Sequence, residues 1–168
     1  MVIGGSLDSW TAMSRPAWER QVDDLGNWCA KAGIRWLTLR TSERGTATAV
    51  PFSRWSRAVG GCDVIVDPSV DGRDRFAAAM RDLDPAEEVN EANVAAVLYH
   101  PADSEPDLIV VIGPPTRLPP SVVWELAYAE LVFVDTDWAT FGADDLSQAV
   151  TDFGGRRRRF GGLDVDDG

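Results

Sequence analysis

Four consecutive arginines, at positions 156–159, lie between glycine pairs in the segment GGRRRRFGG, which spans residues 154–162. Guanidinium groups bind phosphate oxygens through paired hydrogen bonds, and glycine lets the backbone approach a ligand closely. Nucleic acid, a membrane surface or a diphosphate could therefore bind here. The arginines could also form a solvated face that pairs with Asp164, Asp166 and Asp167.

The overall charge narrows this choice. The chain of 168 residues holds 16 basic and 27 acidic residues, for a net charge of −11. A nucleic-acid duplex repels such a protein, so we expect no nucleic-acid partner. The length and the 45% hydrophobic content favour one globular domain with a substantial core.

Targeting and redox signals indicate the compartment. The sequence has no apolar run of about 18 residues, and its first residues lack the basic and then apolar pattern of a secretory signal. Cys29 and Cys62 match no metal or redox spacing, so we expect two buried, reduced thiols. These features predict a cytoplasmic protein.

Strand and helix patterns alternate along the chain. Apolar runs predict strands at 1–4, 34–40, 63–66, 107–112 and 131–134. Helical spacing predicts helices at 14–33, 52–59, 73–83, 84–99, 121–130 and around 146–153, with a capping box over 84–87 opening the fourth. The alternation predicts an α/β fold with an open, mainly parallel sheet flanked by helices, as a single domain over 1–162 with an acidic tail at 163–168.

In such sheets, ligands bind at the carboxyl ends of the strands. The loop after the strand at 107–112 contains Pro114, Pro115, Pro119 and Pro120, which exclude regular structure, and it also carries Arg117. This loop is therefore the first place to expect a ligand.

Residues 106–161 resemble the C-terminal third of the cis-prenyltransferases, the family that includes undecaprenyl diphosphate synthase. The residues that match the family pattern, in order, are Pro106, Asp107, Leu108, Gly113, Arg117, Leu118, Trp124, 127–131, Phe133, Asp135, Trp138, Phe141 and 158–161. A weaker, collinear likeness covers 32–43 and 71–83. The resemblance implies the family's α/β fold in a truncated form.

The resemblance also implies a chemistry. The family joins isopentenyl diphosphate to an allylic diphosphate, with Mg²⁺ and an aspartate to ionise the allylic substrate and arginines to hold the diphosphates. It suggests substrate contacts for Arg117 and for the R-x-G motif of Arg159 and Gly161, and a metal role for Glu130, which could equally be a hydrogen-bonding residue at a subunit interface. Trp124, Tyr128, Glu130, Phe133 and Trp138 match the family's subunit interface and core.

Three departures separate this chain from the active members. With Trp10 aligned to the tryptophan of the family's DGN-x-RW motif, Gly5 stands in the place of the catalytic aspartate, and Asp8 lies three residues late. Val111 replaces a diphosphate-binding arginine, and Pro119 replaces a serine. Between 43 and 63 about 20 residues stand where the family has a long helix and a further strand, so the resemblance implies little room for a long product.

The chain is similar in this profile to the non-catalytic subunit of heteromeric cis-prenyltransferases, the group of the Nogo-B receptor. We expect a subunit that is inactive alone and supplies Arg159 and Gly161 in trans to a catalytic partner. The partner would hold most of the Mg²⁺, and peripheral membrane contact would come through the partner or the product. The alternatives are a homodimeric short-chain enzyme that uses Asp8 and a scaffold or regulatory protein that keeps only the fold.

Overall fold

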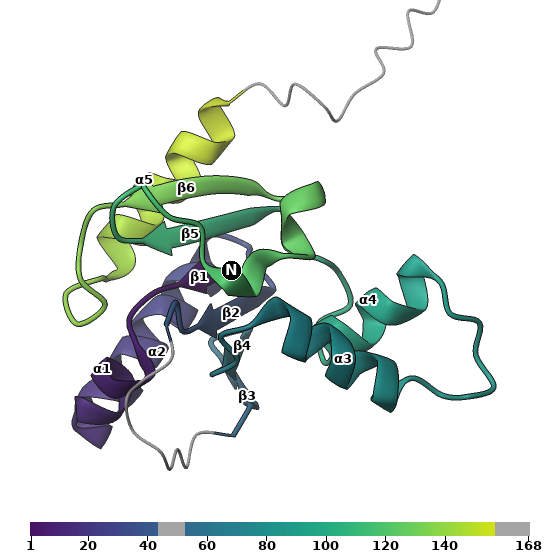
Figure 1. Ribbon diagram of the computed structural model, residues 1–168. Helices are drawn as coiled ribbons and strands as arrows, with labels where there is room; N and C mark the ends of the chain where they lie inside the picture. The colour runs from purple at the N-terminus through teal and green to yellow at the C-terminus, as the bar shows by residue number, and fades with distance from the viewer. Residues whose placement is uncertain (44–52, 157–168) are drawn as a thin grey trace, which may run out of the picture.

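A computed structural model describes residues 1–43 and 53–156 of the chain (Figure 1). Arg159 and Gly161, the residues expected to contact a diphosphate in trans, lie outside this described part. The same is true of the boundary expected between the domain and its acidic tail.

A six-stranded sheet forms the centre of the molecule (Figure 1). Its strands, in the order β3-β4-β2-β1-β5-β6, are Trp55–Val59, Cys62–Asp67, Trp36–Arg40, Val2–Ile3, Leu108–Ile112 and Glu130–Val134. All neighbouring pairs are parallel except β3 with β4. The predicted open, mainly parallel sheet is therefore confirmed.

Helices cover both faces of this sheet. The α-helices are α1 (Leu7–Ala12), α2 (Arg15–Lys31), α3 (Gly72–Asp82), α4 (Glu91–Tyr99) and α5 (Ala143–Gly155), and two 3₁₀ turns are η1 (Pro120–Val122) and η2 (Glu125–Ala127). Helices α2 and α5 pack together on one face, whereas α3 contacts α4 and η1 on the other. Alternate strand residues face the two sides, so Val110 enters the α2 side of the core and Ile109 the η1 side.

Local sequence signals explain where α2 begins and ends. Ser14 caps it by accepting a hydrogen bond from the Ala17 N–H, and a proline follows in the first turn, as predicted. Gly33, whose φ is +74°, follows the C-cap of α2 and turns the chain away from the helix. Cys29 and Cys62 are both buried and free of disulfide bonds, which confirms the expectation for them.

The helix predicted for 52–59 is wrong in the described part. Trp55–Val59 forms strand β3 instead, paired antiparallel to β4 with Val59 opposite Cys62. Gly60 and Gly61 have φ of +61° and +104°, the positive values that a two-residue hairpin turn needs. The glycine pair therefore joins two strands rather than ending a helix.

The helix predicted to open at the capping box over 84–87 begins later. Asp84 accepts a hydrogen bond from the Ala86 N–H and so closes a local turn. Asn90 is the actual N-cap of α4, since its side chain accepts from the Asn93 N–H. The local turn at Asp84 therefore competes successfully with the helix start.

The helix predicted for 121–130 is replaced by the turns η1 and η2, which lead directly into β6. Glu125 is only 2% exposed there, whereas Val123 is 59% and Tyr128 77% exposed. The segment therefore buries a carboxylate and exposes apolar side chains, the reverse of an ordinary amphipathic helix. Within the described ranges, no helix is long and apolar enough to cross a bilayer.

Candidate functional site

The carboxyl end of β1 lies at the edge of the sheet where ligands are expected. Gly5 lies two residues after the end of β1, and its carbonyl accepts a hydrogen bond of 2.9 Å from the Ser42 N–H, just beyond β2. On the other side of β1, the Gly113 N–H donates to Val134 O at 2.8 Å, at the ends of β5 and β6. Gly5, the residue expected in the place of the family's aspartate, therefore lies centrally among the strand ends.

Gly5 leaves no space for a side chain. Its φ is +68°, in the left-handed region that favours glycine. A Cβ atom there would lie 2.7 Å from Ser9 Oγ and 2.9 Å from Trp138 Cβ. The Trp138 ring is buried against Trp10 and Trp18, with centroid distances of 5.1 and 5.7 Å. Ser9 and this aromatic packing thus leave no room for a carboxylate at residue 5.

Asp8 does not take over this position. It lies in the first turn of α1, whose N-cap Ser6 accepts a hydrogen bond of 3.1 Å from the Ser9 N–H. The acidic side chain therefore belongs to a helix start, where a negative charge is favourable in any protein. Its placement has an ordinary structural reason.

Arg117 lies at the strand-end edge, but it is exposed. Its Nη1 is 3.9 Å from Glu43 Oε1, and the two side chains are 79% and 63% exposed, so this pair contributes little to stability. Glu43 adjoins the β1 end, since its carbonyl accepts a hydrogen bond from the Leu7 N–H. Val111, which was expected in the place of a family arginine, is only 3% exposed and belongs to the core.

Glu130 lies at the opposite edge of the sheet from Gly5. It is the first residue of β6, and its N–H donates to Asp107 O just before β5. Arg156, directly after α5, has its Nη1 3.9 Å from Glu130 Oε2 and donates to Leu131 O at 2.8 Å. Glu130 and the start of the arginine run therefore meet at the amino ends of the strands.

These residues do not fit a complete Mg²⁺ site. A hard cation such as Mg²⁺ takes several oxygen ligands, usually from carboxylates and substrate phosphates. In the described part of the chain, no group of three or more His, Cys, Asp or Glu side chains could hold a metal. Glu130 faces an arginine, and Gly5 offers no oxygen from a side chain. We therefore derive no metal-dependent step from this chain.

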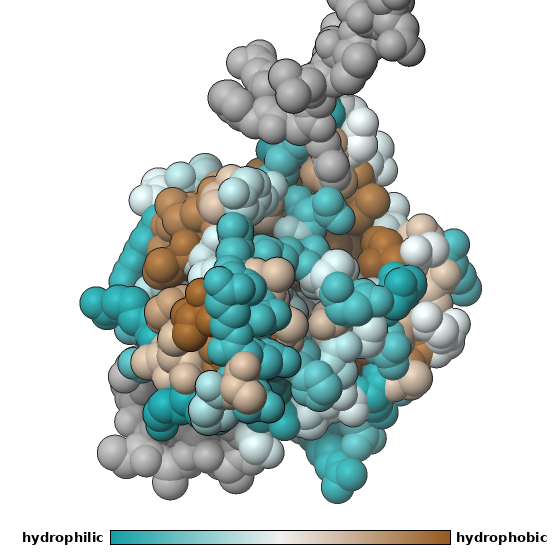
Figure 2. Space-filling view, turned by 90° about the vertical axis from the view of Figure 1, so that its right-hand side faces the viewer, coloured by the Kyte–Doolittle hydropathy of each residue, from teal (hydrophilic) through white to brown (hydrophobic). Residues whose placement is uncertain are grey.

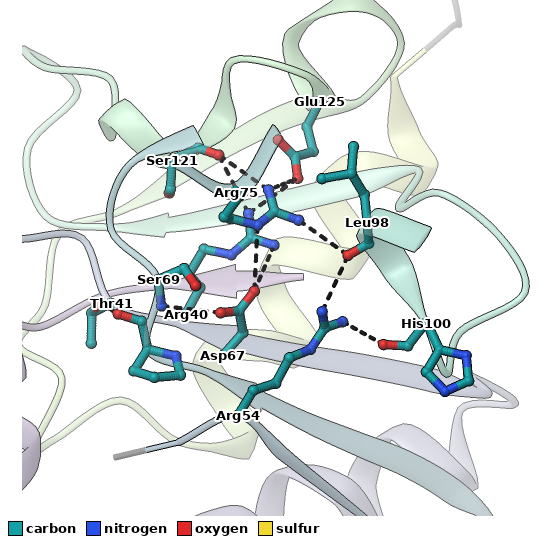
Figure 3. A network of polar contacts seen from close by, with 11 residues as sticks. Arg40, Thr41, Arg54, Asp67, Ser69, Arg75, Leu98, His100, Ser121 and Glu125 are labelled. Carbon is teal, nitrogen blue, oxygen red and sulfur yellow. Dashed lines mark hydrogen bonds and ion pairs between the residues drawn. The ribbon is translucent and has the colours of Figure 1, made fainter. Parts of the chain in front are cut away.

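A buried ion cluster joins the β2 and β4 ends to α3 and η2 (Figure 3). The Arg40 guanidinium lies 3.1 Å from Glu125 Oε1 and 3.4 Å from Asp67 Oδ2. The Arg75 guanidinium lies 3.0 and 3.5 Å from the same two oxygens. All four side chains are at most 6% exposed. Two arginines and two carboxylates thus balance one another inside the fold.

The cluster keeps its carboxylates ionised. Burial raises the pKa of Asp67, but Arg40, Arg75 and hydrogen bonds from Ser69 together hold that pKa below its usual value. Burial likewise raises the pKa of Glu125, and the same two arginines bring it below its usual value. Each charge therefore depends on its partners, because an isolated buried charge is costly.

This cluster was not predicted, although the sequence carries two signals for it. Arg40 and Asp67 each end a strand whose preceding residues are largely apolar and contribute to the core. A charged residue in such a place is unusual unless it is paired. Glu125 carries no comparable signal, because it lies in the segment 121–130, for which a helix was predicted.

The residues expected at an interface separate into two groups. Tyr128 is exposed, and Trp124 is half-buried and stacks on Phe76 with a centroid distance of 5.9 Å. Phe133 is half-buried beside the η1 core, and Trp138 is only 3% exposed and lies in the core. Trp138 thus supports the β1 end instead of offering a surface to a partner.

Exposed apolar side chains surround η1, η2 and the start of α4. They are Phe76, Val89, Leu118, Val123, Leu126 and Tyr128. All but Leu118 and Leu126 line a shallow groove of about 520 Å³. Figure 2 views the side of the molecule that carries α3 and α4, where brown hydrophobic patches interrupt the teal polar surface. Clustered apolar exposure of this kind is typical of interaction surfaces.

Comparison with known proteins decides the family. A family model described as "Putative undecaprenyl diphosphate synthase" matches residues 59–161, more than half of the chain. The chain belongs to the undecaprenyl diphosphate synthase family of cis-prenyltransferases. The resemblance stated from the sequence is confirmed to that extent, and the match includes the arginine run.

Two curated relatives illustrate the likeness. The isoprenyl transferase of Caulobacter vibrioides is 38% identical over 82 residues, which are 49% of this chain and 32% of that protein. The ditrans,polycis-undecaprenyl-diphosphate synthase ((2E,6E)-farnesyl-diphosphate specific) of Xanthomonas axonopodis pv. citri is 39% identical over 101 residues, 55% of this chain and 39% of that protein. The matched region thus spans only about a third of each relative.

A solved structure matches this cis-prenyltransferase family member over more of its length than the two relatives do. The crystal structure of a probable undecaprenyl diphosphate synthase from Campylobacter jejuni aligns with a TM-score of 0.51 at 21% identity. It covers 95% of this chain, and this chain covers 81% of it. The likeness confirms a truncated form of that α/β fold.

Proposed function

We propose that this chain is a non-catalytic subunit of a heteromeric cis-prenyltransferase. In this role it pairs with a catalytic subunit and supplies Arg159 and Gly161 to the diphosphate site of that partner. The complex makes polyprenyl diphosphate from isopentenyl and allylic diphosphates, with Mg²⁺ held by the partner.

The lack of space for a carboxylate at Gly5 is the main support for this proposal. A carboxylate that binds a metal must be placed to within a fraction of an ångström, and the space at position 5 is occupied by Ser9 and Trp138. On this proposal, the described residues do not ionise an allylic diphosphate by themselves. The chain's C-terminal motif nevertheless remains within the region that matches the family.

Two further observations support action in trans. The chain leaves α5 beside Glu130, at the amino ends of the strands. Gly5 lies at their carboxyl ends, so the arginine run starts away from the edge of the sheet where ligands are expected. The exposed apolar side chains at η1 and η2, including Val123 and Tyr128, provide a surface on which a partner can bind. Arg159 would bind a diphosphate through its guanidinium, and the Gly161 N–H would donate to a phosphate oxygen.

The test is isopentenyl transfer to farnesyl diphosphate with Mg²⁺. It uses this chain alone, a full-length cis-prenyltransferase from the same source alone, and the two mixed. We expect the activity of the mixture to exceed the sum of the separate activities. Arg159→Ala should reduce this gain in activity at least about 100-fold, as the loss of one charge-stabilising hydrogen-bond donor does in other enzymes. Arg157→Ala is the matched control and should retain the gain.

The other outcomes favour the alternatives. Turnover by the chain alone, abolished by Asp8→Asn, would make it a homodimeric short-chain enzyme. A gain that survives Arg159→Ala would indicate a scaffold that acts through the fold alone. Either result would remove the proposal that the tail completes the site.

A further inference from the structure

A second cavity lies at the amino ends of the strands, remote from Gly5. Its volume is about 400 Å³, and it opens between the end of α2, the start of β2, the segment 102–107 and α5. Much of its wall is apolar, including Leu108 and Val110 from β5 and Leu146, Val150 and Phe153 from α5. A cavity of this size and lining suits an aromatic or aliphatic side chain.

Acidic groups surround this cavity. Asp103, Glu105 and Asp107 all line it, and Arg35 pairs with Asp103 at 2.6 Å. Met1 also lines it, and burial lowers the pKa of its amino group to about 6. Among the described lining residues, carboxylates therefore outnumber cationic groups, and burial raises the pKa of Glu105. A positively charged segment would relieve this excess.

The end of the described chain lies at the same place. Phe153 lines the cavity, and three residues later Arg156 contacts the amino end of β6, which is hydrogen-bonded to Asp107. The sequence continues with three more arginines and then Phe160. The five residues from Arg156 to Phe160 can span up to about 17 Å, comparable to a five-residue strand. An aromatic residue preceded by guanidinium groups thus begins within reach of an apolar cavity with an acidic margin.

We propose that, in the absence of a partner, Phe160 occupies this cavity and the arginines at 157–159 pair with the carboxylates around it. The contact would hold the R-x-G motif on the body of its own chain. Its regulatory meaning rests on the proposed function, since a partner that needs Arg159 must first release the tail. The apparent affinity for the partner is then lowered by the fraction of chains whose tail is bound.

The test is ¹⁵N NMR of the full chain alone, which needs neither substrate nor partner. The heteronuclear NOE of amides 157–162 reports whether the tail is ordered, and the amide shifts of Asp107 and Phe153 report on the cavity. We expect the tail amides to show clearly higher NOE values than 164–168. Phe160→Ala should lower them to the level of 164–168 and shift the cavity amides, whereas Val165→Ala, the matched control, should do neither.

A second variant separates loss of the aromatic ring from loss of the cavity. Val150→Phe fills the cavity from α5 and should release an unchanged tail. NOE values for 157–162 equal to those for 164–168 in the unmodified chain would overturn the proposal. So would cavity amides that keep their shifts in Phe160→Ala, since the cavity would then be empty or hold another occupant. Neither result bears on the activity of the mixed complex, so the proposed function can fail or stand separately.

Discussion

Trp138 packs against the only face of Gly5 on which a side chain could be placed, with its Cβ 2.9 Å from the position that a Cβ at residue 5 would take. The ring is in turn buried between Trp10 and Phe141, at centroid distances of 5.1 and 6.5 Å. The tryptophan cannot retreat without disturbing this aromatic group, because protein cores are closely packed. The packing around residue 5 therefore excludes a carboxylate there.

Restoring the aspartate should consequently fail. Gly5→Asp places a side chain at φ of +68° and against Ser9 and Trp138, so we expect it to lower the free energy of unfolding by at least about 2 kcal/mol and to give no prenyl transfer by the chain alone. Urea unfolding and the transfer assay measure the two effects. Gly154→Ala is the control, since a Cβ there meets nothing within 4 Å. A stable, active Gly5→Asp would show that the β1 end is an intact catalytic position.

Removing one charge from the buried ion cluster should strongly lower the free energy of unfolding. Glu125→Gln keeps the shape of the side chain but leaves Arg40 and Arg75 with one carboxylate, that of Asp67. Removing one partner of a buried pair costs about 3 to 5 kcal/mol. Urea unfolding at pH 7 measures this loss. Asp23→Asn, which breaks a half-exposed pair with Arg57, should change the free energy by less than about 1 kcal/mol.

The same cluster should make the fold sensitive to acid. The pKa values of Asp67 and Glu125 are below their usual values in the folded chain, so the unfolded chain binds more protons as the pH falls. Their contribution to stability is therefore complete above about pH 5 and is lost as the pH drops through about 4 toward the folded pKa values. Urea midpoints between pH 6 and pH 3 should fall steeply, and less steeply in Glu125→Gln. Parallel curves for the two proteins would contradict this assignment.

Most of the sheet could be predicted because its strands are marked locally. Apolar runs such as 107–112 identify buried strands without reference to the rest of the chain. Strand β3 was missed because its residues, Trp55–Val59, are mostly exposed and carry no continuous apolar run. Only the positive φ values at Gly60 and Gly61, which the sequence permits but does not require, turn that segment back along β4.

The candidate site could be predicted only in part, for a different reason. The absence of a carboxylate at Gly5 follows from the sequence, but the obstruction by Trp138 depends on a contact across the whole chain. The ion cluster joins Arg40 to Glu125, which are 85 residues apart. Such a pairing depends on tertiary packing, which overrides the local helical pattern of 121–130. The inverted burial of Glu125 and Tyr128 follows from it.

The surface that this inversion creates gives the last prediction. Tyr128 is 77% exposed, so Tyr128→Asp should leave the free energy of unfolding within about 0.5 kcal/mol of its original value. If the face around η2 binds the catalytic partner, a charge at this position should weaken the complex at least about 10-fold, since aromatic residues dominate such interfaces. Titration calorimetry with the full-length cis-prenyltransferase measures the affinity.

The matched control for this surface is Ala12→Asp. It adds the same charge at an exposed position at the end of α1, away from η1 and η2 in Figure 1. It should leave the affinity unchanged, because the repulsion between two exposed charges is largely screened beyond about 10 Å. Equal weakening by both variants would mean that added negative charge alone opposes pairing, which would be a general effect in a chain of net charge −11. Unchanged affinity in Tyr128→Asp would place the partner elsewhere and leave the apolar face of η1 and η2 without its proposed role.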